Sequence, residues 1–166
     1  MREYVESLIA RYRKKGILID TNLLLLFFVG SYDPLLVGKA KRVRQFVLHD
    51  YQLIVNIVDS FETVVTTPNI LTEVSNFTAQ LPVHDKEACF MVFSRLVSSF
   101  EESYQPSKNL CDLPPFPRFG LTDTAIIDLS PGQHLVLTDD FRLSGYLQNI
   151  GVDAINFNHI RTLNWR

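Results

Sequence analysis

Short apolar runs that end abruptly in polar residues alternate along this chain with stretches of helical periodicity. Residues 17–19 and 135–137 are uninterrupted apolar runs, as expected of strands that are buried on both faces of a parallel sheet. Two further runs, residues 63–67 and 152–157, indicate two more strands. Because helical stretches separate these strands, the pattern predicts an α/β protein with three α/β/α layers and a central, mostly parallel sheet.

The helical periodicity predicts most of the connections between these strands. Predicted helices cover residues 2–14, 23–29, 37–48 with a continuation over 51–61, 69–77, 85–102, 121–129 and 141–149. Thr67 followed by Pro68 predicts a helix start, because threonine caps helices and proline is tolerated in the first turn. Residues 104–119 are rich in proline and are predicted to form a long loop.

Composition and charge narrow the class of protein. A length of 166 residues fits a single domain over residues 1–166. The formal net charge of −2 excludes a strongly basic coat for nucleic acid but is compatible with a local basic groove. Two cysteines without metal-binding spacing predict reduced thiols in a cytoplasmic protein. The longest apolar run, residues 23–29, is too short to span a bilayer, so no membrane partner is expected.

Acidic residues recur where a ligand crevice is expected. Asp20 directly follows the first predicted strand, and Asp139 and Asp140 follow the run 135–137. In open α/β sheets, ligands bind beyond the carboxyl ends of the strands. A single aspartate there is most often a helix cap. The recurrence favours a site, which would be completed by two acidic residues near helix starts, Glu73 and Asp123.

Four carboxylates that come together predict a particular chemistry. Their charges would repel one another and raise their pKa values unless a cation neutralised them. Carboxylate oxygens are hard ligands that suit Mg²⁺ or Mn²⁺. A metal ion held in this way lowers the pKa of a bound water and stabilises charge on a phosphoryl oxygen. The pattern therefore predicts metal-dependent phosphodiester hydrolysis, with one or with two metal ions.

Over residues 16–157 the chain resembles the PIN-domain family of nucleases. The four acidic positions of the family carry over through the motifs ILIDTN, TTPNILTEV, LTDTAIID and LVLTDDFRL, as Asp20, Glu73, Asp123 and Asp140. Asn22 and Thr138 carry over from the first and last motifs. A shift of one residue in the last motif would exchange Asp140 with Asp139.

The resemblance implies a metal-dependent endoribonuclease. Asp20, Asp123 and Asp140 would bind Mg²⁺ or Mn²⁺. Glu73 would ligate a metal or orient the attacking water. Asn22 and Thr138 would hold the carboxylates through hydrogen bonds, as groups behind metal ligands do. Messenger, ribosomal and transfer RNA, and also structured DNA, stay open as substrates.

Basic residues that could face a phosphate backbone are few. The candidates are Lys39, Lys41, Arg42, Arg44, Arg118 and Arg142. For each of them, a solvated surface role unrelated to RNA is the alternative.

Many small members of the family are toxins of bacterial toxin–antitoxin pairs, so the resemblance implies an antitoxin or another protein partner. The additional N-terminal helix at about 2–14 and the segment 104–119 depart from a typical toxin. A homodimer is compatible with the sequence, although no stretch indicates it. Two other functions are alternatives to a ribonuclease. A haloacid-dehalogenase-like phosphatase would need a second acid where this chain has Asn22, and a catalytically inactive PIN-like module would bind RNA or a protein partner.

Overall fold

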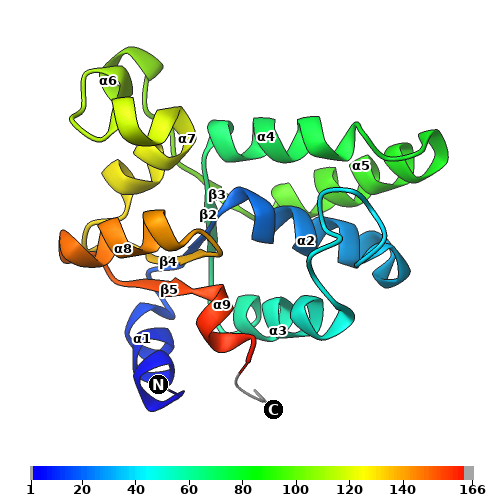
Figure 1. The fold of residues 1–166 in the computed structure, drawn as a ribbon, viewed down its shortest axis with the longest axis horizontal. Helices are drawn as coiled ribbons and strands as arrows, with labels where there is room; N and C mark the ends of the chain where they lie inside the picture. Colours follow the sequence, from blue (N-terminus) through cyan, green and yellow to red (C-terminus); the bar gives the residue numbers. More distant parts are fainter. Residues whose placement is uncertain (1, 163–166) are drawn as a thin grey trace.

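The computed structural model describes residues 2–162 and has a five-stranded sheet at its centre (Figure 1). All neighbouring strands are parallel, in the order β3-β2-β1-β4-β5. The strands are β1 (Ile17–Ile19), β2 (Val64–Thr66), β3 (Glu101–Glu102), β4 (Leu135–Thr138) and β5 (Ala154–Asn156). Helices flank this sheet, which confirms the predicted three-layer α/β/α fold.

The helices follow the strands in alternation along the chain. They are α1 (Arg2–Tyr12), α2 (Thr21–Tyr32), the 3₁₀ turn η1 (Pro34–Leu36), α3 (Leu48–Val58), α4 (Pro68–Thr78), α5 (Val83–Val97), α6 (Ser107–Cys111), α7 (Phe116–Leu129), α8 (Phe141–Asn149) and α9 (Phe157–Ile160). The predicted cap of α4 is confirmed, because the Thr67 hydroxyl accepts a hydrogen bond from the Ile70 N–H at 3.2 Å. Within residues 2–162, no helix is both long enough and apolar enough to cross a membrane.

β1 and β4 form the middle of the sheet. Ile17 pairs with Leu135 and Ile19 with Leu137, and every residue of both strands is buried. The pairing continues past the end of β1, because the Asp20 N–H donates to the Leu137 carbonyl at 3.0 Å. Asp20 is therefore fixed by backbone hydrogen bonding at the carboxyl edge of the sheet.

The strand order changes direction at that edge. From β1 the chain moves outward to β2 and β3, and it then returns to the other side of β1 with β4 and β5. Helices that follow two such strands leave in opposite directions, and the space between them is where open α/β sheets bind ligands. The strand order reverses between β1 and β4, where Asp20 and Asp140 begin α2 and α8.

α2 is the most buried helix of the described chain, because α3, α4 and α5 all pack against it. Phe28 lies 4.8 Å from Phe93 and 5.9 Å from Phe100, measured between ring centroids. α3 approaches so closely that a Cβ atom at Gly30 would overlap the ring of Tyr51. Packing on all sides holds α2 in place, and with it the acidic residue at its amino end.

Three sequence predictions about the connections are wrong. Residues 37–47 form turns rather than a helix, with Gly38 at a φ of +83°, because Val43 and Phe46 from this segment pack into the core. The helix predicted over 85–102 ends at Val97, and residues 101–102 form the edge strand β3. The loop predicted over 104–119 contains α6 and the first turn of α7.

Candidate active site

Asp20 is both the last residue of the β1 pairing and the N-cap of α2. Its Oδ1 accepts a hydrogen bond from the Thr21 N–H at 2.6 Å, and its Oδ2 accepts one from the Thr138 hydroxyl at 2.5 Å. Only 7% of Asp20 is exposed. Burial raises the pKa of Asp20 to about 6, although the two hydrogen bonds lower it, and the charges of Asp139 and Asp140 raise it further. The helix-cap and functional-site interpretations therefore apply to the same side chain.

Thr138 connects the ends of the two central strands. Its hydroxyl donates to Asp20 and accepts a hydrogen bond from the Asp140 N–H at 3.0 Å. The side chain is fully buried at the end of β4. The prediction that Thr138 holds a carboxylate through a hydrogen bond is confirmed.

Replacing Thr138 by Val is expected to lower the free energy of unfolding by about 1–3 kcal/mol, because a buried carboxylate and a backbone N–H each lose a partner. Thr66→Val is the matched control. Thr66 is also fully buried in a strand of the same sheet, but its hydroxyl has no hydrogen-bond partner. Urea denaturation at pH 7 measures both variants. Equal destabilisation by the two substitutions would contradict the role of Thr138.

Asp140 is the N-cap of α8. Its Oδ1 accepts hydrogen bonds from the N–H groups of Arg142 at 2.6 Å and Leu143 at 3.1 Å. Its Oδ2 has no hydrogen-bond donor among residues 2–162. Asp140 is exposed, so this oxygen is available to a ligand in solution.

Asp139 is oriented differently from Asp140. Its carboxylate accepts from the Asn22 side chain at 3.3 and 3.5 Å, and its carbonyl accepts from Asn158 Nδ2 at 2.8 Å. Burial is the main cause of its raised pKa, and Arg161 lowers it. Of the two neighbouring aspartates, Asp140 is the one whose charge is among the main influences on Asp123. Asp140 therefore keeps an oxygen without a donor among residues 2–162, whereas Asp139 is the partner of Asn22.

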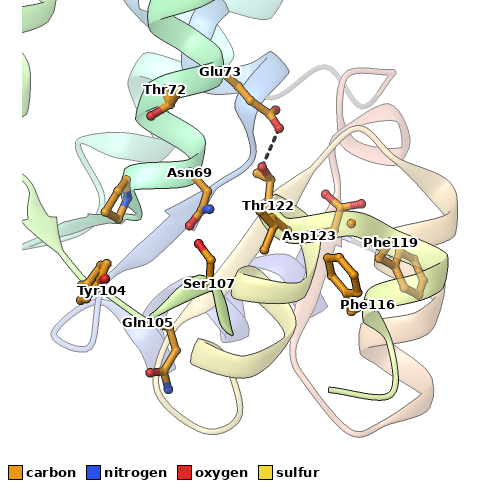
Figure 2. A pocket seen from close by; sticks show the side chains of 13 residues that line it. Asn69, Thr72, Glu73, Tyr104, Gln105, Ser107, Phe116, Phe119, Thr122 and Asp123 are labelled. Atoms are coloured by element: carbon orange, nitrogen blue, oxygen red, sulfur yellow. Dashed lines mark hydrogen bonds between the residues drawn. The ribbon is translucent and has the colours of Figure 1, made fainter. Parts of the chain in front are cut away.

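Glu73 is held by two hydroxyl groups from other helices. Its Oε2 accepts from the Thr21 hydroxyl at 3.0 Å, and its Oε1 accepts from the Thr122 hydroxyl at 2.5 Å, as the dashed line in Figure 2 marks. These bonds join α4 to α2 and to α7. Glu73 therefore lies between the three helices, beside the amino end of α2.

Asp123 completes the group from α7. This helix is interrupted at Gly120, whose φ of +75° favours glycine, and the break separates residues 116–119 from the turn that carries Asp123. The carboxylate has no hydrogen-bond donor within residues 2–162.

The pKa of Asp123 depends on its burial and on the charges of its neighbours. Burial is the largest influence and raises the pKa to about 7; the charges of Asp20, Asp140 and Glu73 raise it as well, whereas Arg142 lowers it. Three of the predicted acidic residues, Asp20, Glu73 and Asp140, thus act electrostatically on the fourth, Asp123.

The six predicted RNA-facing residues divide into two groups. Arg118 and Arg142 lie over Phe119, with guanidinium carbons 5.0 and 4.8 Å from its ring centroid, and Arg142 donates to the Arg118 carbonyl. Of the two, Arg142 lowers the pKa of Asp123. The other four lie on the turns of residues 37–47, where Arg42 stacks on the ring of Phe77 at 4.2 Å. No hydrogen bond or ion pair of the described residues joins Lys39, Lys41, Arg42 or Arg44 to the acidic group.

The fit of the acids to a metal ion is partial. Among residues 2–162, no three or more His, Cys, Asp or Glu side chains are arranged so that they could hold an ion by themselves. The donor chemistry nevertheless suits Mg²⁺ or Mn²⁺, because the hard oxygens of Asp123 and the Oδ2 of Asp140 have no donor among residues 2–162. Mg²⁺ usually binds through one or two carboxylates, with waters and substrate phosphates as its other ligands. The group therefore fits an ion that substrate and water complete.

The sequence patterns do not predict three residues that hold the acidic residues through hydrogen bonds. Thr21 and Thr122 bind Glu73, and Asn158 holds the backbone of Asp139. Thr21 and Thr122 each lie directly beside a predicted acid in the sequence, and this position is the feature from which their role could be predicted. Nothing in the sequence indicates Asn158.

A scan of this chain against models of known protein families finds no match, and a search of curated proteins finds none either. The resemblance to the PIN-domain family therefore depends on the four acidic motifs alone.

Proposed function

We propose that this chain is a metal-dependent endoribonuclease of the PIN type, which hydrolyses RNA phosphodiester bonds. Its proposed active site consists of Asp20, Glu73, Asp123 and Asp140. One observation carries the proposal. Asp20, Glu73 and Asp140, from three other segments, act on Asp123, and together with burial they raise its pKa to about 7. Crowding of like charges costs stability unless a cation neutralises it, so the arrangement favours a cation-binding role.

The carboxylate oxygens that lack a donor within residues 2–162 suggest which residues would bind the metal ion. Among residues 2–162, Asp123 and Asp140 offer oxygens without donors, and each oxygen of Asp20 accepts one hydrogen bond. These three residues are therefore the proposed ligands of Mg²⁺ or Mn²⁺. A bound ion would supply an activated water and would neutralise charge on the phosphoryl oxygen.

Glu73 has a separate proposed role. Both of its oxygens accept hydroxyl hydrogen bonds, which fix the carboxylate without using all of its lone pairs. A carboxylate fixed in this way can accept a hydrogen bond from the attacking water and hold it in line with the phosphorus atom. Arg142, whose charge lowers the pKa of Asp123, is near enough to attract the RNA backbone.

A second candidate function is a module that binds RNA or a protein partner without cleavage. The observation that favours it is that no group of three acids in the described chain closes around an ion. The two functions differ in whether metal ions bind and whether RNA is cut.

Cleavage of end-labelled single-stranded and hairpin RNA by the purified chain distinguishes the two functions. The nuclease should cut with Mn²⁺ or Mg²⁺ and stop when a chelator is added. Isothermal titration calorimetry with Mn²⁺ measures metal binding independently of cleavage. If RNA stays intact and no metal binding is measured, the nuclease proposal is refuted and the binding module takes its place.

A further inference from the structure

A solvent-open cavity of about 740 Å³ lies directly beside the acidic group. Its lining comes from α4, from residues 104–107 and from α7, and Glu73 and Asp123 form part of it (Figure 2). Cavities that bind small ligands usually measure about 300–1,000 Å³. This cavity is therefore large enough for one nucleotide.

Aromatic side chains in the cavity are available for stacking. Phe119 already contacts Tyr146, Arg118 and Arg142. Phe116 has no aromatic or cationic partner in residues 2–162, and Tyr104 is 72% exposed at the rim. A flat, neutral ring that enters the cavity can stack on Phe116, because unpaired nucleobases bind to proteins in this way.

Uncharged polar groups lie across the same space. Asn69 from α4 and Ser107 from α6 point toward one another in Figure 2. Neither side chain has a hydrogen-bond partner among the described residues. An amide can both donate to and accept from the edge of a base.

The charges of the cavity favour a base over a phosphate. The residues that line it include no Lys or Arg, and its charged members are the acids Glu73 and Asp123. Arg118 and Arg142 instead lie over Phe119. A nucleotide would therefore direct its phosphate out of the cavity, toward Arg118 and Arg142, and its base into the cavity.

We propose that this cavity is a nucleobase subsite, in which one unpaired base stacks on Phe116 and forms hydrogen bonds with Asn69 and Ser107. Its position next to the scissile phosphate depends on the proposed function. A base within a duplex is stacked on both sides and paired at its edge, so it cannot enter without being extruded. Binding is therefore selective for unpaired segments.

Fluorescence anisotropy with a labelled single-stranded octaribonucleotide tests the subsite. The measurement uses the Asp20→Asn protein with Mg²⁺, and the wild-type protein with chelator, so that the probe stays intact. Phe116→Ala should weaken binding about tenfold, since stacking on an aromatic side chain contributes about 1–3 kcal/mol per base. Phe116→Trp should preserve binding, and the exposed aromatic Tyr4 on α1 provides the control Tyr4→Ala.

The subsite is refuted if Phe116→Ala binds the single strand as tightly as its parent, or if the annealed duplex binds as tightly as the single strand. If Phe116→Ala fails to fold, the wild-type protein is instead photocrosslinked to a single-stranded RNA that contains 4-thiouridine. Crosslinks that lie outside residues 69–123 refute the subsite. Binding that depends on Phe116 without any cleavage by the wild-type chain would support the subsite and refute the nuclease. If Phe116→Ala changes neither cleavage nor binding, the nuclease is supported and the subsite is refuted.

Discussion

Asp20→Asn is expected to slow metal-dependent RNA hydrolysis by at least about 10³-fold, because losing one ligand charge removes several kcal/mol of metal-assisted stabilisation. The fold should survive the change. The asparagine oxygen can still accept from the Thr21 N–H, and its amide group can donate to the Thr138 hydroxyl. The measurement is kcat/KM for a labelled RNA hairpin with Mn²⁺.

Asp59→Asn is the matched control for this variant. Asp59 is exposed at the carboxyl end of α3, in the connection that leads into β2, and its side chain has no hydrogen-bond partner among residues 2–162. It should leave hydrolysis unchanged. If Asp20→Asn retains wild-type activity, Asp20 is a helix cap only. If the variant is unfolded by circular dichroism, its main role is structural.

In the presence of a chelator, the free energy of unfolding should fall as the pH rises from about 4 to about 7. Asp20 has a pKa of about 6 in the folded protein against an ordinary value of 3.8. Between these values the folded state binds more protons than the unfolded state, so stability decreases with increasing pH. For Asp20 alone the loss is about 3 kcal/mol at pH 7.

Asp123 should change stability in the same direction, because its pKa is raised to about 7. Its effect should be smaller than that pKa indicates, since the side chain is partly exposed and solvent screens its charge. Adding Mn²⁺ at pH 7 should restore the lost stability, because a bound cation neutralises the carboxylates.

Urea denaturation of wild-type protein and of Asp20→Asn, from pH 4.5 to 7.5 with chelator, measures this dependence. The variant should be more stable than wild type at pH 7 and should lose this advantage toward pH 4.5. Ion pairs elsewhere, such as Arg161 with Asp50, contribute equally to both proteins and cancel in the difference. A difference that is independent of pH would contradict the prediction.

The centre of the fold could be predicted because its signals are local. Residues 17–19 and 135–137 are short apolar runs, and burial on both faces of a parallel sheet requires such runs. Asp20 directly follows the first run, and Thr138, Asp139 and Asp140 follow the second. The strand-end position of Asp20 and Asp140 follows from the same pattern. The helix α8 was predicted with its observed bounds, since Asp140 begins it and Gly151 follows its end.

The errors occur where distant contacts decide the conformation. β3 consists of two exposed glutamates, a composition that does not indicate a strand, and its pairing with β2 makes it one. Pro115 and Pro117 suggested a loop, but proline is also common at helix starts, where α7 places them. The two hydroxyl bonds to Glu73 depend on how α2, α4 and α7 pack, which no local pattern encodes.

The pairing of β1 with β4 has a consequence for synthesis of the protein. Thr138, which holds Asp20, follows it by 118 residues, and chains fold from the amino end as they emerge from the ribosome. While β1, β2 and β3 are being made, Asp20 has neither its hydroxyl donor nor the neighbouring Asp140. Under the proposed function, the growing chain is therefore inert toward the messenger that encodes it until β4 has emerged and joined the sheet.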